Sequence, residues 1–417
     1  MIKKLSTEFR FFLSMPYNMR VLLITNMLYS LVLPVVEIFM AAYIMRYFSD
    51  TSYVAFFQVA MYTGIIITSL ANGFLLKSFK VAHLYSFGIL LSGLSMVGMM
   101  FVKDISLIGL IISGTLIGAS SGFFWTNRYL MALNTTSDEN RNYFFGLESF
   151  FFTISNIIVP LVIGALLASI DGKKLLGITF NIYSGYRIVT LIVVVITILA
   201  CFSLAHGKFK NPEQKDFLYF RFDRLWNKQI LLAALKGLIQ GFLVTAPAML
   251  IMKYVGKEGS LGLIQGISGG LTAILIYLLG RFAKPKHRIL IFGAGITIFL
   301  IGTIVNGIEL SMIGVIVFVL CKVFYQPMYD LAYYPIMMKV IDIVSKREKR
   351  SEYAYILNHE FGLYAGRVVG LGLFIFLALY VSETFALRYS LVIVAVIQML
   401  SILLAKNIMK ESYSESK

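Results

Sequence analysis

Twelve stretches of this sequence are each long and apolar enough to cross a membrane as a helix. A helix needs roughly 20 mostly apolar residues to cross a hydrocarbon layer of about 30 Å. The stretches fall at about 21–48, 53–76, 84–102, 105–133, 143–169, 186–206, 229–254, 260–280, 289–306, 310–338, 353–381 and 387–405. The sequence therefore predicts an all-α membrane protein with twelve spans. The even number of spans returns both chain ends to the same side.

The composition also indicates a membrane protein. Of the 417 residues, 59% are hydrophobic and 14% are charged, whereas a soluble domain has about 25% charged residues. This shortage of charge excludes a soluble enzyme, a disordered chain and a nucleic-acid-binding factor. Cys201 and Cys321 both lie in apolar stretches, so neither a disulfide framework nor a cysteine-based metal site is indicated. We expect no cofactor and no metal.

The distribution of Lys and Arg predicts the orientation in the membrane. These residues collect in the cytoplasmic loops of membrane proteins. With the N-terminus placed in the cytoplasm, 25 of the 37 Lys and Arg residues fall in cytoplasmic segments and eight in outer segments. We therefore expect both termini in the cytoplasm and the protein in the plasma membrane, the inner membrane of a bacterium. This bias explains the net charge of +16 without a nucleic-acid partner.

A long basic connection divides the chain after the sixth span. Residues 207–228 separate a first bundle of six spans, 1–206, from a second, 229–417. The connection carries the aromatics Phe217, Tyr219, Phe220, Phe222 and Trp226 between basic residues. This composition suits a helix lying among lipid headgroups. The alternative is an ordinary solvated linker.

Short matches between the two parts indicate a duplicated six-helix unit. The segment GFLLK at 73–77, after the second span, is followed 207 residues later by GRFAK at 280–284, after the eighth. Glu148 near the start of the fifth span and Glu360 near the start of the eleventh are 212 residues apart. Self-similarity at a steady offset is the usual sign of an internal repeat.

With these features the chain resembles the major facilitator superfamily. The resemblance covers nearly the whole chain as architecture and implies two pseudo-symmetric bundles around a central cavity. The family's loop motif is degenerate, because Lys77 and Lys80, which follow Gly73, stand where Asp and Gly are expected. Pro160 and Gly164 keep part of a fifth-helix signature that antiporters of the family carry. The resemblance therefore implies a secondary transporter and slightly favours export.

Eight charged residues lie inside the predicted spans. They are Glu37, Arg128, Glu148, Lys236, Lys322, Asp330, Glu360 and Arg367. A charge in hydrocarbon costs at least about 2.5–3.5 kcal/mol on insertion scales, so each should face a cavity or a partner. They fall on the first, fourth, fifth, seventh, tenth and eleventh spans, the helices that the resemblance implies line or border the cavity. We expect them to point inward.

Depth along the helices predicts which of these charges meet. Arg128 and Glu148 both lie near the predicted cytoplasmic face and should pair, either as a structural bridge or as a gate that breaks during transport. Lys236, Asp330 and Glu360 lie at similar depths of about 10 Å, so one lysine could answer both acids. We expect these five residues to act in gating or proton coupling.

Two bases lie near the middle of the membrane, where transporters hold their substrates. Lys322 and Arg367 could bind an anion or a headgroup, or they could pair structurally with acids on neighbouring helices. Glu360, seven residues before Arg367, is predicted to be too far along the helix for a direct bridge. The same helices offer polar or aromatic side chains for a substrate, among them Gln326, Tyr29, Trp125 and Tyr333.

Glu37 is predicted to stand alone. It lies three residues after Pro34, toward the outer half of the first span, with no base at a similar depth inside any span. An acid that is neutral when buried and ionises when exposed suits proton coupling. The alternative is a protonated Glu37 bonded to a helix carbonyl.

These features predict a monomeric secondary transporter, driven by a proton or other ion gradient, that moves a small amphipathic or anionic solute across the lipid bilayer. Uptake of a nutrient anion or flipping of a glycolipid remains open. A membrane-embedded lipid-modifying enzyme would need a catalytic constellation, and the four His residues lie on separate segments. A non-transporting sensor of the same fold is the remaining alternative.

Overall fold

The computed structural model describes residues 10, 12–101, 106–136, 138–175, 178–211, 216, 218–282 and 287–414. Within these residues, twelve helical spans are long and apolar enough to cross a membrane. They are α2 (Tyr17–Ser30) with η1 (Val35–Phe39) and α3 (Met40–Phe48), α4 (Thr51–Leu75), α5 (Val81–Phe101), α6 (Leu107–Thr135), α7 (Asp138–Ile170), α8 (Ile182–Ala205), α9 (Arg224–Leu243) with α10 (Ala246–Tyr254), α11 (Glu258–Phe282), α12 (Arg288–Ile308), α13 (Met312–Glu348), α14 (Glu352–Tyr380), and α15 (Glu383–Gln398) with α16 (Leu400–Ser414). The predicted all-α fold with twelve spans is confirmed.

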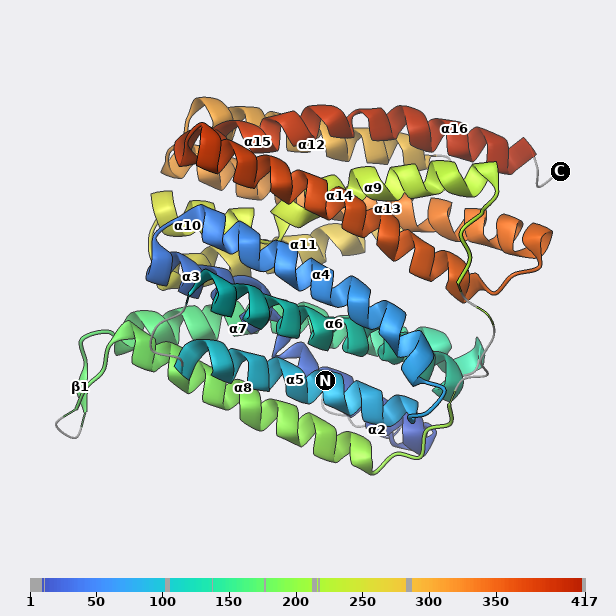
Figure 1. Cartoon of the computed structure of the whole chain (residues 1–417), viewed down its shortest axis with the longest axis horizontal. Coiled ribbons are helices and arrows are strands. Elements are labelled where there is room, and N and C mark those ends of the chain that lie inside the picture. The colour runs from blue at the N-terminus through green and yellow to red at the C-terminus, as the bar shows by residue number, and fades with distance from the viewer. Residues whose placement is uncertain are drawn as a thin grey trace.

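The helices form two bundles of six spans that lie side by side (Figure 1). The spans α2–α8 make the N-terminal bundle and the spans α9–α16 the C-terminal bundle, and the two meet along α4 and α14 and along α7 and α11. A short antiparallel pair, β1 (Lys174–Leu175) with β2 (Ile178–Thr179), projects from one end. We call this the hairpin end, and we call the opposite end, which holds the connection 206–223, the linker end.

Three described spans are broken near the middle, the first in the N-terminal bundle and the seventh and twelfth in the C-terminal bundle, where α15 ends at Gln398 and α16 begins at Leu400. In the first span, Pro34 lacks the N–H that would continue α2, and the chain resumes as the π-helical turn η1, which carries Glu37. In the seventh span, α9 ends at Leu243 and α10 starts with Pro247 in its first turn. A break of this kind leaves backbone groups without helix partners and changes the direction of the side chains that follow. A membrane protein tolerates such a break where it lines a cavity.

Several helices are longer than the sequence predicts, among them α13, α16 and α9. α13 continues to Glu348, so most of the basic stretch 339–350, predicted as a connection, is helical. α16 continues to Ser414, and α9 begins at Arg224. These extensions are polar, so they fall below the apolar threshold that defines a span although their backbone stays helical.

The prediction of a headgroup-level helix in the connection is wrong for the part of it that the structure describes. Residues 207–211 and 218–223 are not helical, while Phe217 and the loop residues 283–286 lie outside the described residues. Trp226 lies inside α9 and is buried, and its indole N–H donates to the Asn358 side chain at 2.8 Å. Phe222 packs edge-on against Tyr355 of α14. These aromatics therefore fasten the connection to the C-terminal bundle.

Glycine permits the closest helix packing in the N-terminal bundle. A Cβ atom on Gly114 would lie 2.7 Å from the Phe57 carbonyl oxygen, and one on Gly118 would meet the backbone of Met61. Both glycines lie where α6 meets α4, and small residues spaced by four let two helices approach this closely.

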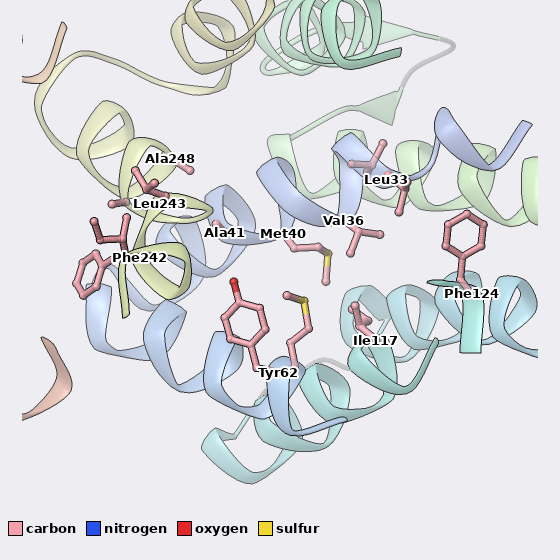
Figure 2. Packing of buried hydrophobic residues seen from close by; sticks show 14 of the residues in the cluster. Leu33, Val36, Met40, Ala41, Tyr62, Ile117, Phe124, Phe242, Leu243 and Ala248 are labelled. Atoms are coloured by element: carbon pink, nitrogen blue, oxygen red, sulfur yellow. The ribbon is translucent and has the colours of Figure 1, made fainter. Parts of the chain in front are cut away.

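Apolar packing joins the bundles toward the hairpin end. Figure 2 shows Met40 and Ala41 of α3 in one cluster with Leu243 and Ala248 of the seventh span. Where α7 meets α11, a Cβ on Gly164 would lie 2.8 Å from Gly262, so only glycine allows this approach. The bundles are therefore tightly packed in this half of the molecule.

Candidate functional site

A cavity of about 600 Å³ lies between the two bundles. Its lining comes from η1 and α7 of the N-terminal bundle and from α9, α11 and α13 of the C-terminal bundle. It reaches Leu279, three residues before the linker end of α11. Among the described lining residues, four are charged, namely Glu37, Lys236, Lys322 and Asp330. The cavity therefore holds charged groups in a region that hydropathy assigns to the membrane.

Glu37 and Lys322 face this cavity from opposite bundles. Glu37 is exposed to the cavity, and Lys322 lies on α13, about 15 Å from the hairpin end of that helix. Their charges interact, but the carboxylate and the ammonium form no ion pair within 4.0 Å. An acid and a base thus share one aqueous space without neutralising each other.

The prediction that Glu37 has no nearby base is therefore wrong. Glu37 lies eleven residues before Phe48 and Lys322 ten residues after Met312, so the two residues lie at the same depth from the hairpin end. Lys322, predicted as an anion-binding residue, is the base that answers it. The sequence analysis placed Lys322 and Arg367 at one ligand, but the structure does not bring these two residues together.

Arg367 lies beside the cavity, behind Gln240. Its guanidinium is buried and donates to the Gln240 Oε1 from Nη2 at 2.8 Å and from Nε at 3.3 Å. It also lies over the ring of Tyr62 from the N-terminal bundle, 4.6 Å from the centroid. Gln240 itself lines the cavity. Arg367 therefore fixes the orientation of a cavity residue at the junction of the two bundles.

Glu360 is the acid that answers Arg367. Arg367 Nη1 lies 3.7 Å from Glu360 Oε2, so the prediction that seven residues separate them too far for a bridge is wrong. Long side chains reach along the helix, and depth counting locates only backbone positions. His359 next to it is buried and shares a hydrogen bond of 2.6 Å with the Tyr333 hydroxyl. Tyr333, predicted as a substrate contact, is buried in this packing.

Lys236 and Asp330 form the ion pair that their depths predict. Lys236 Nζ lies 2.7 Å from Asp330 Oδ1. The ammonium also lies 4.2 Å from the centroid of Tyr333 and 4.0 Å from that of Tyr334. Glu360 feels the charge of the same lysine. Asp330 is thus the direct partner of Lys236, whereas Glu360 lies within 3.7 Å of Arg367, so the expectation that one lysine answers both acids stays a prediction.

Arg128 and Glu148 pair inside the N-terminal bundle as the sequence predicts. Arg128 Nε donates to Glu148 Oε1 at 2.7 Å, and its Nη2 contacts the second carboxylate oxygen. Asn26 donates to the same carboxylate at 2.6 Å. Glu148 is 1% exposed and Arg128 7%. The pair ties the first, fourth and fifth spans together.

The other two predicted substrate residues of this bundle pack in its interior. Tyr29 is buried, with its hydroxyl 3.3 Å from that of Ser120 and its ring against Phe124. Trp125 is half-buried and stacks on Phe152 near Arg128. Of the substrate contacts predicted from sequence, Gln326 and Lys322 line the cavity.

The sequence analysis missed the uncharged polar lining contributed by α7 and α11. These residues are Thr153 and Asn156 on α7 and Gln265, Ser268 and Thr272 on α11. The α11 residues recur every three or four positions, which places them on one face of the helix. That spacing is a signal in the sequence, but a search limited to charged residues overlooks it.

The analysis also missed a cluster of ionic contacts between the bundles at the hairpin end. Arg46 donates to both carboxylate oxygens of Glu258, from Nε at 3.0 Å and from Nη2 at 2.6 Å. Tyr186 donates to Glu258 at 3.1 Å. Glu258 belongs to the C-terminal bundle, and the two donors belong to the N-terminal one. This cluster was not predicted because its residues lie at the ends of the spans.

A second acid at the same end also joins the bundles. The backbone N–H and the hydroxyl of Thr51 donate to Glu383 at 3.1 and 2.8 Å. Lys253 pairs with the other oxygen of Glu383 at 2.5 Å. We call Arg46–Glu258 together with Thr51–Glu383 the hairpin-end clasp. It holds the hairpin end closed beyond the cavity.

Known proteins share this architecture. A family model described as Major Facilitator Superfamily matches residues 22–358. Among curated relatives, the "Uncharacterized protein YqgE" of Bacillus subtilis (strain 168) is 20% identical over 381 residues, which cover 88% of this chain and 84% of that protein.

Solved structures show the same fold at low identity. A bacterial homologue of the ferroportin iron transporter in an inward-facing state has a TM-score of 0.68 at 16% identity, and the match covers 96% of this chain and 99% of that one. A bacterial homologue of the lysosomal transporter Spinster, inward-facing and occupied, has a TM-score of 0.67 at 16% identity, covering 94% and 96%.

Proposed function

This chain belongs to the Major Facilitator Superfamily, and on that premise we propose that it is a proton-coupled secondary transporter that exports a small amphipathic organic solute by alternating access. The observation that carries the proposal is the cavity between the bundles, into which Glu37 and Lys322 project from opposite sides. Interconverting inward and outward states around a fixed site is how transporters built from repeats work.

The conformation supports a state open at the linker end. The lining extends toward that end at Leu279, while the hairpin-end clasp and the apolar packing of α3 against α10 close the other. The two solved structures compared above are titled inward-facing. We propose that the linker end is cytoplasmic, with both termini on that side. The units that rock are 1–206 and 229–417, joined by 207–228.

The clasp is proposed to be the outer gate. For the cavity to open at the hairpin end, Arg46 and Tyr186 must part from Glu258, and Thr51 must part from Glu383. Hydrogen bonds to charged groups contribute about 1.5–3 kcal/mol each. This range is enough to hold one state while leaving the other accessible to a ligand or proton that favours it.

Glu37 is proposed to carry the transported proton. With substrate bound, the carboxylate is ionised, and after release it takes a proton, which lowers the cost of closing the cavity around it. Substrate and proton then compete for one group, which yields exchange in opposite directions and favours export. Lys322 supplies the fixed positive charge across the cavity. Gln240, held by Arg367, and Gln326 would complete the substrate contacts.

We favour an organic solute over a metal ion, although one similar structure is titled a homologue of an iron transporter. Each carboxylate in the lining has a lysine beside it, Lys322 near Glu37 and Lys236 bound to Asp330. Positive charges at these positions oppose the binding of a metal cation.

The proposal can be tested without knowing the substrate. Pairs of spin labels would be placed at Lys77 and Glu352, at the linker end, and at Asp171 and Val381, at the hairpin end, since all four are exposed. The distances between the labels of each pair would be measured by double electron–electron resonance in nanodiscs across a pH series. We expect two populations in which one distance lengthens as the other shortens, with a balance that depends on pH.

The Glu37→Gln variant provides the discriminating control, because it fixes the proposed proton carrier in a neutral form. It should keep both populations but lose most of their pH response. The matched variant Glu309→Gln, which removes an exposed acid at the hairpin end, should respond like the unmodified protein. A single distance population at each end under every condition would contradict alternating access. An undiminished pH response in Glu37→Gln would contradict the role of Glu37.

A further inference from the structure

Among the charges of the described cavity lining, two are left for a ligand. Lys236 and Asp330 are bonded to each other at 2.7 Å. Glu37 and Lys322 form no ion pair within 4.0 Å, although each feels the charge of the other. The acid and the base therefore face one cavity, with more than 4.0 Å between the carboxylate and the ammonium.

The two groups also belong to different bundles. Glu37 is carried by the π-helical turn of the first span, and Lys322 by α13. A ligand that bonds to both would link the bundles across the cavity. Such a link is the contact that could couple binding to the rocking of one bundle against the other.

The remaining lining suits a ligand that combines charge with an apolar part. Gln265 and Gln326 offer hydrogen-bonding groups from α11 and α13. Ile239, Leu243 and Val323 form an apolar wall beside them. A pocket that binds an organic molecule typically has such a wall with a few convergent polar groups.

We propose that the transported solute is a zwitterion, whose cationic group binds Glu37 and whose anionic group binds Lys322, with its apolar part on the wall of Ile239, Leu243 and Val323. This deepens the proposed function, on which it rests, by naming the substrate class. A purely anionic or cationic ligand would leave one of the two charges without a counter-charge in a low-dielectric site, which is costly. A ligand bearing both charges satisfies both residues at once.

The test uses four compounds with the same six-carbon chain, so that only charge differs. They are hexanoate, hexylamine, 2-aminohexanoate with adjacent charges, and 6-aminohexanoate with separated charges. Binding to the purified full-length chain would be measured by calorimetry in nanodiscs of phosphatidylglycerol. We expect at least one zwitterion to bind about tenfold or more tightly than both hexanoate and hexylamine, because it gains one more charged hydrogen bond. The proposal is overturned if neither zwitterion binds more tightly than these two, including the case in which none of the four binds.

Charge variants assign each end of the ligand. Glu37→Gln should weaken zwitterion binding about tenfold or more and leave hexanoate binding unchanged. Lys322→Gln should weaken zwitterion binding by a similar factor and leave hexylamine binding unchanged. The exchange variant Glu37→Lys/Lys322→Glu should regain zwitterion binding that both single variants lose, because the ligand can reverse. Lys257→Gln and Glu309→Gln remove exposed charges at the hairpin end and should bind like the unmodified chain. Zwitterion binding that survives both single variants undiminished would overturn the assignment.

A zwitterionic head can come from a free metabolite or from a lipid. Repeating the measurement in nanodiscs that contain phosphatidylethanolamine identifies the source. Loss of six-carbon zwitterion binding in these discs points to a lipid headgroup, and unchanged binding points to a free solute. Both results support a zwitterion site.

The failure of this inference is distinguishable from failure of the proposed function. If the spin-label distances alternate but the zwitterions do not bind preferentially, only the substrate class is wrong. If the distances do not alternate, the transport mechanism is wrong whatever the binding series shows.

Discussion

Of the eight charged residues inside the spans, three lie in the N-terminal bundle and five in the C-terminal bundle, and the two bundles use them differently. In the N-terminal bundle, Arg128 and Glu148 satisfy each other through two hydrogen bonds and are almost inaccessible. In the C-terminal bundle, Lys236 and Asp330 lie at the edge of the cavity, and the Asp330 side chain is 31% exposed. The two bases are equally buried, and the pairs differ in their acids, of which Glu148 is buried and Asp330 is partly exposed to the cavity.

The difference shows that the two copies of a duplicated unit can take different roles. The N-terminal bundle presents Glu37 to the cavity and hides its other charges in helix packing. The C-terminal bundle exposes a lysine and an ion pair, and a buried arginine orients Gln240. We infer that Arg128–Glu148 is structural and that the C-terminal charges serve the transport site. Removing charges from each bundle in turn tests this contrast.

The largest effect is expected from Glu148→Gln. The change leaves the Arg128 charge buried without its counter-charge, and breaking a buried pair in this way costs about 3–5 kcal/mol. Thermal unfolding in detergent should show a large loss of stability. The double variant Arg128→Met/Glu148→Met should recover much of it, since no charge stays buried. A double variant as unstable as the single one would show that the pair does more than neutralise itself.

The next largest effect is expected where the bundles meet, from Glu258→Gln. It removes the carboxylate that accepts from Arg46 and Tyr186 and should shift the population toward the state open at the hairpin end. A loss of about 1.5–3 kcal/mol corresponds to a shift of roughly 10- to 100-fold. The Asp171–Val381 spin-label distance would report it. A distance distribution identical to that of Lys257→Gln would contradict the role of the hairpin-end clasp as a gate.

A smaller effect is expected from Asp330→Asn, the C-terminal counterpart of the first test. Asp330 is partly exposed, and Lys236 keeps its contacts with the rings of Tyr333 and Tyr334. Because Lys236 is buried while Asp330 is partly exposed to the cavity, we expect a stability loss of about 1–2 kcal/mol in thermal unfolding, below that of Glu148→Gln. If the two variants lose equal stability, the contrast between the bundles is wrong.

The smallest effect is expected from Arg347→Gln at the linker end. Its side chain is 42% exposed, and its bond to Asp223 at 2.7 Å is accessible to solvent. Exposed pairs contribute about 0–1 kcal/mol. Unfolding should stay close to that of the unmodified chain, and raising the salt concentration should erase any difference. A large loss would show that the connection is held by this pair rather than by Trp226 and Phe222.

Much of the fold could be predicted because hydropathy reports directly on spans. Each of the twelve apolar stretches became a helical span, and their order and number held. Polar continuations were invisible to the same measure, as the extension of α13 to Glu348 illustrates. Helix breaks were equally hidden, because the effect of Pro34 on η1 depends on what packs around it.

Less of the candidate site could be predicted, because depth along a helix does not give the direction of a side chain. Depth found the Arg128–Glu148 and Lys236–Asp330 pairs, which are short contacts between neighbouring helices. It missed the reach of Arg367 to Glu360 within one helix, and it missed that Glu37 and Lys322 face the same cavity. Uncharged residues such as Gln265 gave no sign of facing a cavity until packing assigned their helix face.

Thiol labelling from either side of the membrane tests the central claim most directly. Gln326→Cys places a reactive group in the cavity, in a background where Cys201 and Cys321 are replaced by Ser. In oriented proteoliposomes, a membrane-impermeant reagent should label it from the linker end. With Glu258→Gln added, labelling from the hairpin end should rise roughly tenfold or more as labelling from the linker end falls. Labelling from the same single side in both proteins would contradict a cavity that alternates between the two faces.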